Sequence, residues 1–369
     1  MPDQTTTNGS SLAAIKLAVG QAAFAWRSYP SQRRAIGRFP SGPPILVTGT
    51  HRSGTTWVAN MLMAPGLWTV HEPTNTLHGL WDENFTYAGP GELPPKMERL
   101  WDDALAGRVR RLTMNGLADR RWYPLRLLPQ PIRRVLVKDP IACLAAGAIV
   151  RRFAMGSLVL FRHPAGFVSS LGRLGWPAAV VVDRMRKDDA LVRDHLSDVV
   201  DLLERAAAGD STFARAVLAG VLNRVLWRQV QSLQSDPTVT QPVEVRRFED
   251  LCRDPIVEFR RLHEVFALPY DDRTRRRHAG LCGLDGSNAS DDPQDYATHS
   301  VRRDSAAMAD SWRRQLDAAE VNEIRGVWDR FGVPFYDADE DWNDAPSDAA
   351  TAATASSPDR SPVLQAGRE

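Results

Sequence analysis

The sequence predicts an α/β protein, a three-layer α/β/α sandwich around a central, mainly parallel sheet. Three observations lead to this fold class. Short strand-like segments alternate with helical ones along most of the chain. Three of the strand-like segments are almost entirely apolar, as expected for strands that helices cover on both faces of a sheet. The first segment, at 45–48, is followed by a turn rich in glycine and hydroxyl side chains that leads into a helix.

The elements follow one another in a regular order. We expect five strands bounded by glycine, proline or charged residues, and four long helices with an apolar period of 3.6 residues. The segment 78–133 interrupts this order, because it is irregular and rich in proline, and it predicts an insertion that forms a lid or an acceptor-binding surface. The expected strands are 45–48, 67–71, 134–137, 157–161 and 243–247, and the expected helices are 178–208, 211–233, 256–266 and 318–331.

Composition limits the class of protein. The 369 residues suffice for one large α/β domain or two ordinary ones. The formal net charge of +1 argues against a nucleic-acid-binding protein, since proteins that bind phosphate backbones usually carry a basic excess. Cys143, Cys252 and Cys282 form no CxxC pair, so they predict neither a disulfide framework nor a zinc site. A reducing, cytoplasmic compartment is therefore expected.

We divide the chain into three parts. Residues 1–40 form a polar segment with a mildly amphipathic helix, 41–342 form a single domain, and 343–369 form a disordered tail rich in Ala, Ser, Pro and Asp. The helix at 12–26 either packs on the domain or lies on a membrane surface, together with the arginines that follow it. No apolar run approaches the roughly 20 residues that cross a bilayer.

The most informative motif is the run GTHRSGTTW, which follows the first strand. It is P-loop-like, but Thr55 stands where a nucleoside-triphosphate loop has its lysine. No acidic strand end offers a magnesium ligand, so nucleotide hydrolysis is poorly supported. The remaining polar groups, with the backbone N–H groups of a helix start, suit one compact tetrahedral anion at the 5′ end of a nucleotide. Their side chains are those of Arg52, Ser53, Thr55 and Thr56.

The same run closely resembles the 5′-phosphosulfate-binding loop of the sulfotransferases that use 3′-phosphoadenosine 5′-phosphosulfate (PAPS). Members of that family carry a lysine or arginine and then Ser-Gly-Thr-Thr-Trp, or a near variant, after the first strand. The resemblance implies that PAPS is the donor, that adenosine 3′,5′-bisphosphate is the product and that no metal is needed. It also implies a donor-binding role for the matching residues, which are Arg52, Ser53, Gly54, Thr55, Thr56 and Trp57.

A second segment, GSLVLFRHPAGFVSSLGRL, points to the same donor. Its strand ends at Phe161, Arg162 follows at once, and a proline opens a helix that carries Ser170 in an early turn. Arg162 and Ser170 can therefore meet at one anion beyond the strand ends, where ligands bind in open α/β sheets. The segment resembles the family's 3′-phosphate motif: an arginine at a strand end, then a proline, then a serine on the next helix. Two motifs thus predict the two ends of one donor.

Two later segments resemble the family more loosely. The run VEVRRFEDLCRDP is similar to the family's strand and aromatic-Glu-Asp-Leu turn, with Phe248 in place of the more usual tyrosine, so a hydroxyl contact to the donor is missing. The run HSVRRDSAAMADSWRRQL is similar to the C-terminal loop with basic residues before a helix. Arg302 or Arg303 reaches the 3′-phosphate in one interpretation, and in the other both are solvated surface arginines.

Sulfuryl transfer requires a base near the acceptor hydroxyl and cationic donors at the leaving phosphate. Arg52 fits the second role. The second strand ends in His71 and Glu72 on the edge that carries the loop, and the carbohydrate branch of the family resembles this in placing a glutamate before a proline. Glu72 is the first candidate for the base, and His71, which titrates near neutrality, is the second. Alternatively, both only shape the acceptor pocket.

Lys138 ends the third strand on the same edge. It orients the acceptor, binds the sulfuryl oxygens, or is paired with Asp139 or a neighbouring carboxylate. His51 is expected to be a hydrogen-bonding loop residue rather than a second base. The remaining histidines show no metal-ligand spacing.

The sequence therefore predicts a sulfotransferase that moves a sulfuryl group from PAPS to a hydroxyl of a carbohydrate or glycolipid by in-line displacement. A small alcohol or phenol is the alternative acceptor. Two other classes stay open: a nucleotide-dependent phosphotransferase with an atypical P-loop, which would require magnesium, and a non-catalytic nucleotide-binding module. No motif identifies the acceptor itself or an oligomeric state.

Overall fold

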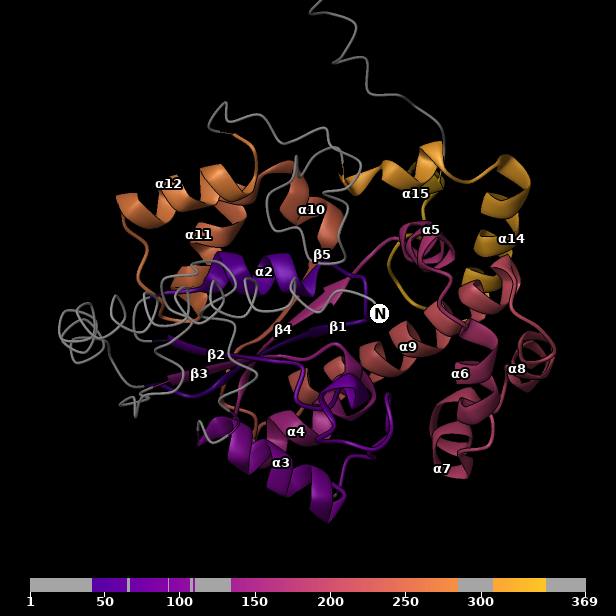
Figure 1. Ribbon diagram of the computed structural model, residues 1–369, viewed down its shortest axis with the longest axis horizontal. Coiled ribbons are helices and arrows are strands. Elements are labelled where there is room, and N and C mark those ends of the chain that lie inside the picture. The colour runs from indigo at the N-terminus through magenta and orange to yellow at the C-terminus, as the bar shows by residue number, and fades with distance from the viewer. Residues whose placement is uncertain are drawn as a thin grey trace, which may run out of the picture. The chain divides into compact units, whose positions relative to one another are not determined.

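The computed structural model of the protein describes residues 42–64, 67–91, 93–106, 109, 134–284 and 308–342 (Figure 1). The predicted N-terminal helix, the tail, Arg302, Arg303 and most of the insertion beyond residue 106 lie outside these residues. The chain divides into two compact units, Met1–Phe335 and Tyr336–Glu369. In the second unit, Trp342 Nε1 donates a hydrogen bond to the carbonyl oxygen of Tyr336 over 2.8 Å.

A five-stranded sheet forms the centre of the first unit, in the order β2-β3-β1-β4-β5. All four strand pairings are parallel, and helices lie on both faces of the sheet, which confirms the predicted fold class (Figure 1). Each strand begins and ends within one residue of its predicted position. The strands are β1 (Ile45–Gly49), β2 (Leu67–His71), β3 (Arg134–Lys138), β4 (Gly156–Phe161) and β5 (Val243–Arg247).

Burial explains why these segments form strands. Every residue of β1, β3 and β4 is buried, as continuous apolar runs in the middle of a parallel sheet should be. On one face, apolar side chains of the helices α2 and α11 form a cluster with strand residues such as Ile45 and Leu158. β5 lies at an edge of the sheet, and all five of its residues are only half-buried.

The helices of the first unit have the following bounds. Before β4 they are α2 (Thr55–Leu62), α3 (Pro95–Leu105) and α4 (Ala146–Phe153), and between β4 and β5 they are α5 (Pro164–Leu174), α6 (Ala178–Met185), α7 (Asp189–Leu191), α8 (Val200–Ala207) and α9 (Thr212–Gln234). After β5 they are α10 (Phe248–Arg253), α11 (Pro255–Val265), α12 (Asp272–Leu281) and α14 (Ala318–Asp329), and α15 (Asp339–Trp342) belongs to the second unit. Short 3-10 helices are η1 (Thr76–His78), η4 (Ile141–Ala145) and η7 (Ser311–Arg314), and η5 (Val192–Leu196) is π-helical.

Two predictions of secondary structure need correction. The segment 78–133 was expected to be irregular, but it contains the helix α3. The expected continuous helix at 178–208 is broken into α6, α7, the π-helical turn η5 and α8. α6 ends at Met185, and a new helix starts at Asp188, whose side chain accepts a hydrogen bond from the backbone N–H of Leu191. Asp188 thus acts as a cap inside a segment whose apolar period alone reads as one helix. The other three predicted helices correspond to α9, α11 and α14.

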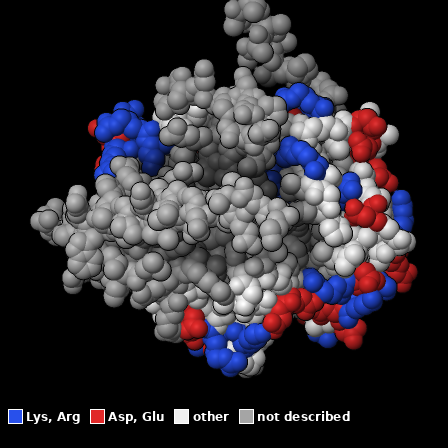
Figure 2. Space-filling view, in the orientation of Figure 1, with Lys and Arg blue, Asp and Glu red and all other residues white. Residues whose placement is uncertain are grey.

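Within the described residues, no single helix is long and apolar enough to cross a membrane; α5 and α6 meet that criterion only as a pair, bent by 118°. Figure 2 shows basic and acidic side chains interspersed over the described surface that is visible from this side. This mixture agrees with the net charge of +1.

Candidate active site

The carboxyl ends of the parallel strands bring the predicted site segments to one edge of the sheet. A cavity of about 270 Å³ lies there. Most of the predicted site residues line it, from both phosphate motifs and from the ends of β2 and β3. They are Arg52, Gly54, Thr55, Thr56, Trp57, His71, Glu72, Lys138, Arg162, Ser170 and Phe248. Ser53 lies just beneath, fully buried.

The loop between β1 and α2 requires glycine at position 54. Gly54 has a φ of 87°, in the left-handed region, and it immediately precedes the first turn of α2. A Cβ atom at this position would clash with the ring of Phe248. Arg52 also has a left-handed φ, of 69°. The loop is therefore wound tightly, so that its backbone amides gather at the start of α2.

The start of α2 is built to receive an anion. Within the described part of the chain, no side chain caps this helix, so its first N–H groups remain available. The buried hydroxyl of Ser53 has no hydrogen-bond partner among the described residues. The hydroxyl side chains of Thr55 and Thr56 border the same cavity. A negatively charged tetrahedral group would satisfy these donors, so the residues present fit the phosphosulfate end of the expected donor.

The two phosphate motifs contact each other directly. Arg52 Nε donates to Ser170 Oγ over 3.0 Å, and Arg162 Nη1 donates to the carbonyl oxygen of Arg52 over 2.7 Å. The guanidinium carbon of Arg162 also lies 5.0 Å from the ring centroid of Phe248. Residues 110 positions apart are thus joined in one network. Phe248, which the sequence analysis named only because its segment resembles the family's turn, packs against both the loop glycine and this arginine.

The part of the cavity at the ends of β2 and β3 contains an ion pair between Lys138 and Glu72. Lys138 Nζ bonds Glu72 Oε1, Asn75 Nδ2 donates to Glu72 Oε2 over 2.6 Å, and His71 Nε2 lies 3.8 Å from Glu72 Oε2. Burial alone would raise the pKa of Glu72, but the charges of Lys138 and His71, and the hydrogen bonds from Lys138 and Asn75, lower it to about 2. Glu72 is therefore ionised at neutral pH. Of the alternatives that the sequence left open for Lys138, the structure shows an ion pair, and the partner is Glu72 rather than Asp139.

Asp139 fixes the turn that carries Glu72, a role that the sequence did not predict. Glu72 itself has a left-handed φ of 45°, and its N–H donates to the carbonyl oxygen of Lys138 over 2.7 Å. Asp139 is fully buried, and its Oδ2 accepts hydrogen bonds from the N–H and hydroxyl of Thr74, over 2.9 and 2.7 Å. Its Oδ1 accepts from two backbone N–H groups of the following turn, at Ile141 and Ala142. The ends of β2 and β3 are thereby locked together.

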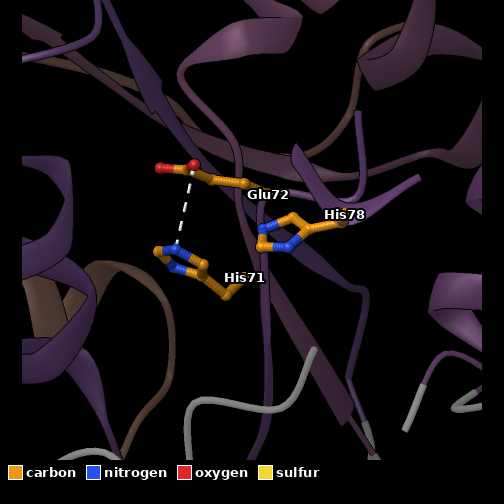
Figure 3. A group of neighbouring side chains, drawn as sticks. All are labelled: His71, Glu72 and His78. Atoms are coloured by element: carbon orange, nitrogen blue, oxygen red, sulfur yellow. Dashed lines mark ion pairs between the residues drawn. The ribbon is translucent and has the colours of Figure 1, made fainter. Parts of the chain in front are cut away.

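The fold also creates a group with metal-ligand spacing that is not evident in the sequence. Figure 3 shows His71 and Glu72 at the end of β2 beside His78 from η1. One ligand atom from each lies within 4.8 Å of the others. Both oxygens of Glu72 already bind Lys138 and Asn75, and the cavity is lined by further cations. These charges disfavour a bound cation, so the absence of a metal requirement stays our prediction.

The ring of His51 lines the cavity together with that of Trp176, which the sequence analysis did not single out. His51 was expected to be a hydrogen-bonding loop residue, but its buried Nδ1 has no hydrogen-bond partner among the described residues. His51 is buried among Phe85, Phe167 and Trp176, with ring centroids 5.0, 4.9 and 5.8 Å away. Burial, and secondarily the charge of Arg52, lower the pKa of His51 to about 3, so its ring is neutral at physiological pH. The proximity of these rings depends on tertiary structure, and no local motif announces it.

No family model matches the chain, and no curated protein matches it in sequence. Several solved structures are similar in fold. The sulfotransferase domain from the curacin biosynthetic pathway is 15% identical over 78% of this chain and 98% of that chain, with a TM-score of 0.40. Mouse sulfotransferase SULT7A1 complexed with PAP is 12% identical over 82% and 89%, with a TM-score of 0.36. A sulfotransferase from Alicyclobacillus acidocaldarius is 12% identical over 76% and 99%, with a TM-score of 0.33. We therefore infer the activity from the side chains of the site.

Proposed function

We propose that the protein is a sulfotransferase that moves the sulfuryl group of PAPS to a hydroxyl of a carbohydrate or glycolipid. One observation carries the proposal: Arg52 from the first motif is hydrogen-bonded to Ser170 from the second, in a single cavity. A donor with anionic groups on both the 3′ and the 5′ oxygen of one ribose needs two cationic positions held at a fixed separation. The contact between the motifs, and the bond from Arg162 to the loop, provide such a fixed pair.

In this proposal each motif binds one end of the donor. The N-terminus of α2, with Thr55 and Thr56, binds the phosphosulfate, and Arg52 stabilises the negative charge that develops on the leaving phosphate. Arg162 and Ser170 bind the 3′-phosphate. The bound donor supplies an activated sulfuryl group. The rings of Trp57 and Phe248, which pack edge to face at 6.0 Å, offer aromatic surface for the adenine.

Glu72 accepts the proton of the acceptor hydroxyl in this proposal. A carboxylate with a pKa of about 2 is a weak base, and a general base works best when its pKa lies near the operating pH. We infer that Lys138 leaves Glu72 for the sulfuryl oxygens when donor and acceptor are bound. Loss of its cationic partner then raises the pKa of the buried Glu72 and strengthens it as a base. His71, 3.8 Å from Glu72, is the alternative base.

The assignment of a carbohydrate acceptor rests on Glu72, which precedes a proline at the end of β2. A small alcohol or phenol is the alternative within the same reaction. A phosphotransferase would need a cation for the β- and γ-phosphates, and Thr55 stands at the position of the usual lysine. The sulfotransferase is therefore the function that we favour.

Calorimetry and mass spectrometry test the proposal together. We expect adenosine 3′,5′-bisphosphate to bind tightly, and a metabolite extract incubated with protein and PAPS to gain a product heavier by one SO3. The same turnover should persist in excess EDTA, since no step requires a metal. Tight binding of ATP with a strict magnesium requirement would instead identify a phosphotransferase. Nucleotide binding without any sulfated product, across a broad panel of acceptors, would indicate a non-catalytic binding protein.

A further inference from the structure

Trp176 is an aromatic side chain that lines the active-site cavity but that neither phosphate motif requires. It follows directly on α5, the helix that carries Ser170. Gly175, with a φ of 61°, ends this helix, and the N–H of Trp176 donates to the carbonyl oxygen of Leu171 over 3.3 Å. The backbone of Trp176 is therefore fixed. The residue is nevertheless 39% exposed, which is a large apolar surface to leave beside a reactive centre.

The position of Trp176 connects both halves of the cavity. Its ring stacks on that of His51, with centroids 5.8 Å apart and planes inclined by 22°. The guanidinium carbon of Arg52, which we place at the leaving phosphate, lies 5.9 Å from the Trp176 ring centroid. His51 and Glu72 line the same cavity as Trp176. An acceptor that touches Trp176 would thus lie near both the leaving group and the base.

His51 makes the support of Trp176 rigid and uncharged. The His51 ring packs tightly against Phe85 and Phe167 as well as Trp176. Because its pKa is lowered to about 3, it carries no charge at neutral pH. The two rings therefore form a stiff aromatic platform, which binds a flat apolar surface with little loss of side-chain entropy.

Polar groups complete the same cavity. Besides Glu72, its lining includes Asn75 and the imidazoles of His71 and His78. A phenol would bury its whole ring in apolar surroundings and would need one polar partner only. A pyranose ring presents an apolar C–H face and a rim of hydroxyl groups, and so needs an aromatic surface together with several hydrogen-bonding side chains. The lining offers both.

We propose that Trp176 forms an acceptor subsite in which its indole ring stacks on the C–H face of a pyranose, while the polar side chains of 71–78 hold the hydroxyl groups. Trp176 is thus a residue that determines acceptor specificity. This inference rests on the proposed function, and it extends that function from a general carbohydrate acceptor to a named contact surface.

Saturation-transfer NMR on the full chain tests the subsite, with the methyl glycosides of glucose, galactose, mannose and N-acetylglucosamine as probes and phenol for comparison. Each probe is titrated with and without adenosine 3′,5′-bisphosphate. Three variants are compared with the wild type: Trp176→Ala, Trp176→Phe, which keeps an aromatic face, and Val180→Ala. Val180 is a matched control, since it is apolar, 68% exposed and close in sequence on α6, and it does not line the cavity.

We expect at least one methyl glycoside to bind through its ring C–H protons, and Trp176→Ala to weaken it about 3- to 10-fold. Trp176→Phe should retain most of the affinity and Val180→Ala all of it. Binding of the bisphosphate should not change in any variant. The inference is wrong if no glycoside binds, if binding ignores Trp176→Ala, or if phenol binds in a Trp176-dependent manner in their place.

Two outcomes separate this inference from the proposed function. If Trp176→Ala weakens the bisphosphate as much as the glycoside, Trp176 belongs to the donor site and the subsite is refuted, although the sulfotransferase proposal survives. If the bisphosphate binds neither to the wild type nor to any variant, the proposed function fails. The titrations without nucleotide then still decide whether Trp176 binds a sugar ring.

Discussion

Lys138 and Glu72 form a buried ion pair across the carboxyl ends of the neighbouring strands β3 and β2. The side chain of Lys138 is 2% exposed and that of Glu72 is 12% exposed. Two opposite charges removed from water are stable only as a pair, and removal of one leaves the other uncompensated. Because the pair lies in the cavity where we place the chemistry, substitutions in it should affect both stability and catalysis.

Replacing Glu72 with glutamine should separate binding from chemistry. The amide keeps the shape of the side chain but cannot accept the proton, and a positioned general base contributes about 10²–10⁴ to the rate. We expect kcat to fall by about 100-fold or more, while calorimetry finds donor affinity near that of the wild type. His71→Asn is the control and should have the milder effect. Near-normal turnover of Glu72→Gln together with collapse of His71→Asn would make His71 the base.

Replacing Lys138 with methionine should destabilise the fold and reverse a pH dependence. In the wild type, the folded-state pKa of Glu72 is lowered from 4.5 to about 2, so the pair stabilises the protein above pH 4.5 and this contribution is lost as pH falls towards 2. Without Lys138, we expect burial, which acts most strongly on this carboxyl group, to outweigh the contacts to His71 and Asn75 and to raise the pKa above 4.5. Stability should then fall as pH rises through 4.5, with a loss of about 3–5 kcal/mol at neutral pH.

Urea unfolding across this pH range measures the effect of Lys138→Met. The double variant Glu72→Gln/Lys138→Met is the control, since it buries no unpaired charge, and it should recover much of the loss. An equal loss in the single and double variants would show that Lys138 acts through its packing. In activity assays, the single variant should gain an acid limb in the pH profile of kcat/KM, because its carboxylate titrates at higher pH.

Arg162 and Ser170 should differ in their contributions to donor affinity. Arg162→Ala removes a charge-assisted contact to phosphate and also the bond to the Arg52 carbonyl, so we expect binding of adenosine 3′,5′-bisphosphate to weaken by roughly 2–3 kcal/mol. Ser170→Ala removes one hydroxyl and should cost on the order of 1 kcal/mol. A nucleotide without the 3′-phosphate is the reference ligand. If it loses as much affinity as the bisphosphate, the residue does not bind the 3′ group.

Alanine at position 54 should disrupt the anion-binding loop. The φ of 87° is strained for any L-residue, and the new Cβ would clash with Phe248. We expect the midpoint of thermal unfolding to fall, with a cost of about 1–3 kcal/mol, and nucleotide binding to weaken further. Gly91→Ala is the matched control, because a Cβ there meets no atom of the described residues within 4 Å. Equal effects of the two substitutions would contradict the strained loop.

The sequence by itself determined the order of elements and the motifs that meet at the proposed donor site. Largely apolar runs of five or six residues set β1, β3 and β4, since strands in the middle of a parallel sheet need continuous burial, whereas the edge strand β5 is only half-buried. The loop at Arg52 and the pair of Arg162 and Ser170 are local motifs: both arginines closely follow a strand end, and Ser170 lies on the next helix. Because parallel strands end at the same edge, local motifs at these ends predict a shared site.

Only the tertiary structure decided the charges and contacts within that site. The sequence left Lys138 with two possible partners, and the fold pairs it with Glu72 because β2 and β3 are neighbours in register. The same register lets Asp139 bind Thr74 and fix the turn at Glu72. These interactions join residues far apart in the chain, so their energies depend on burial and distance, which the order of residues does not specify.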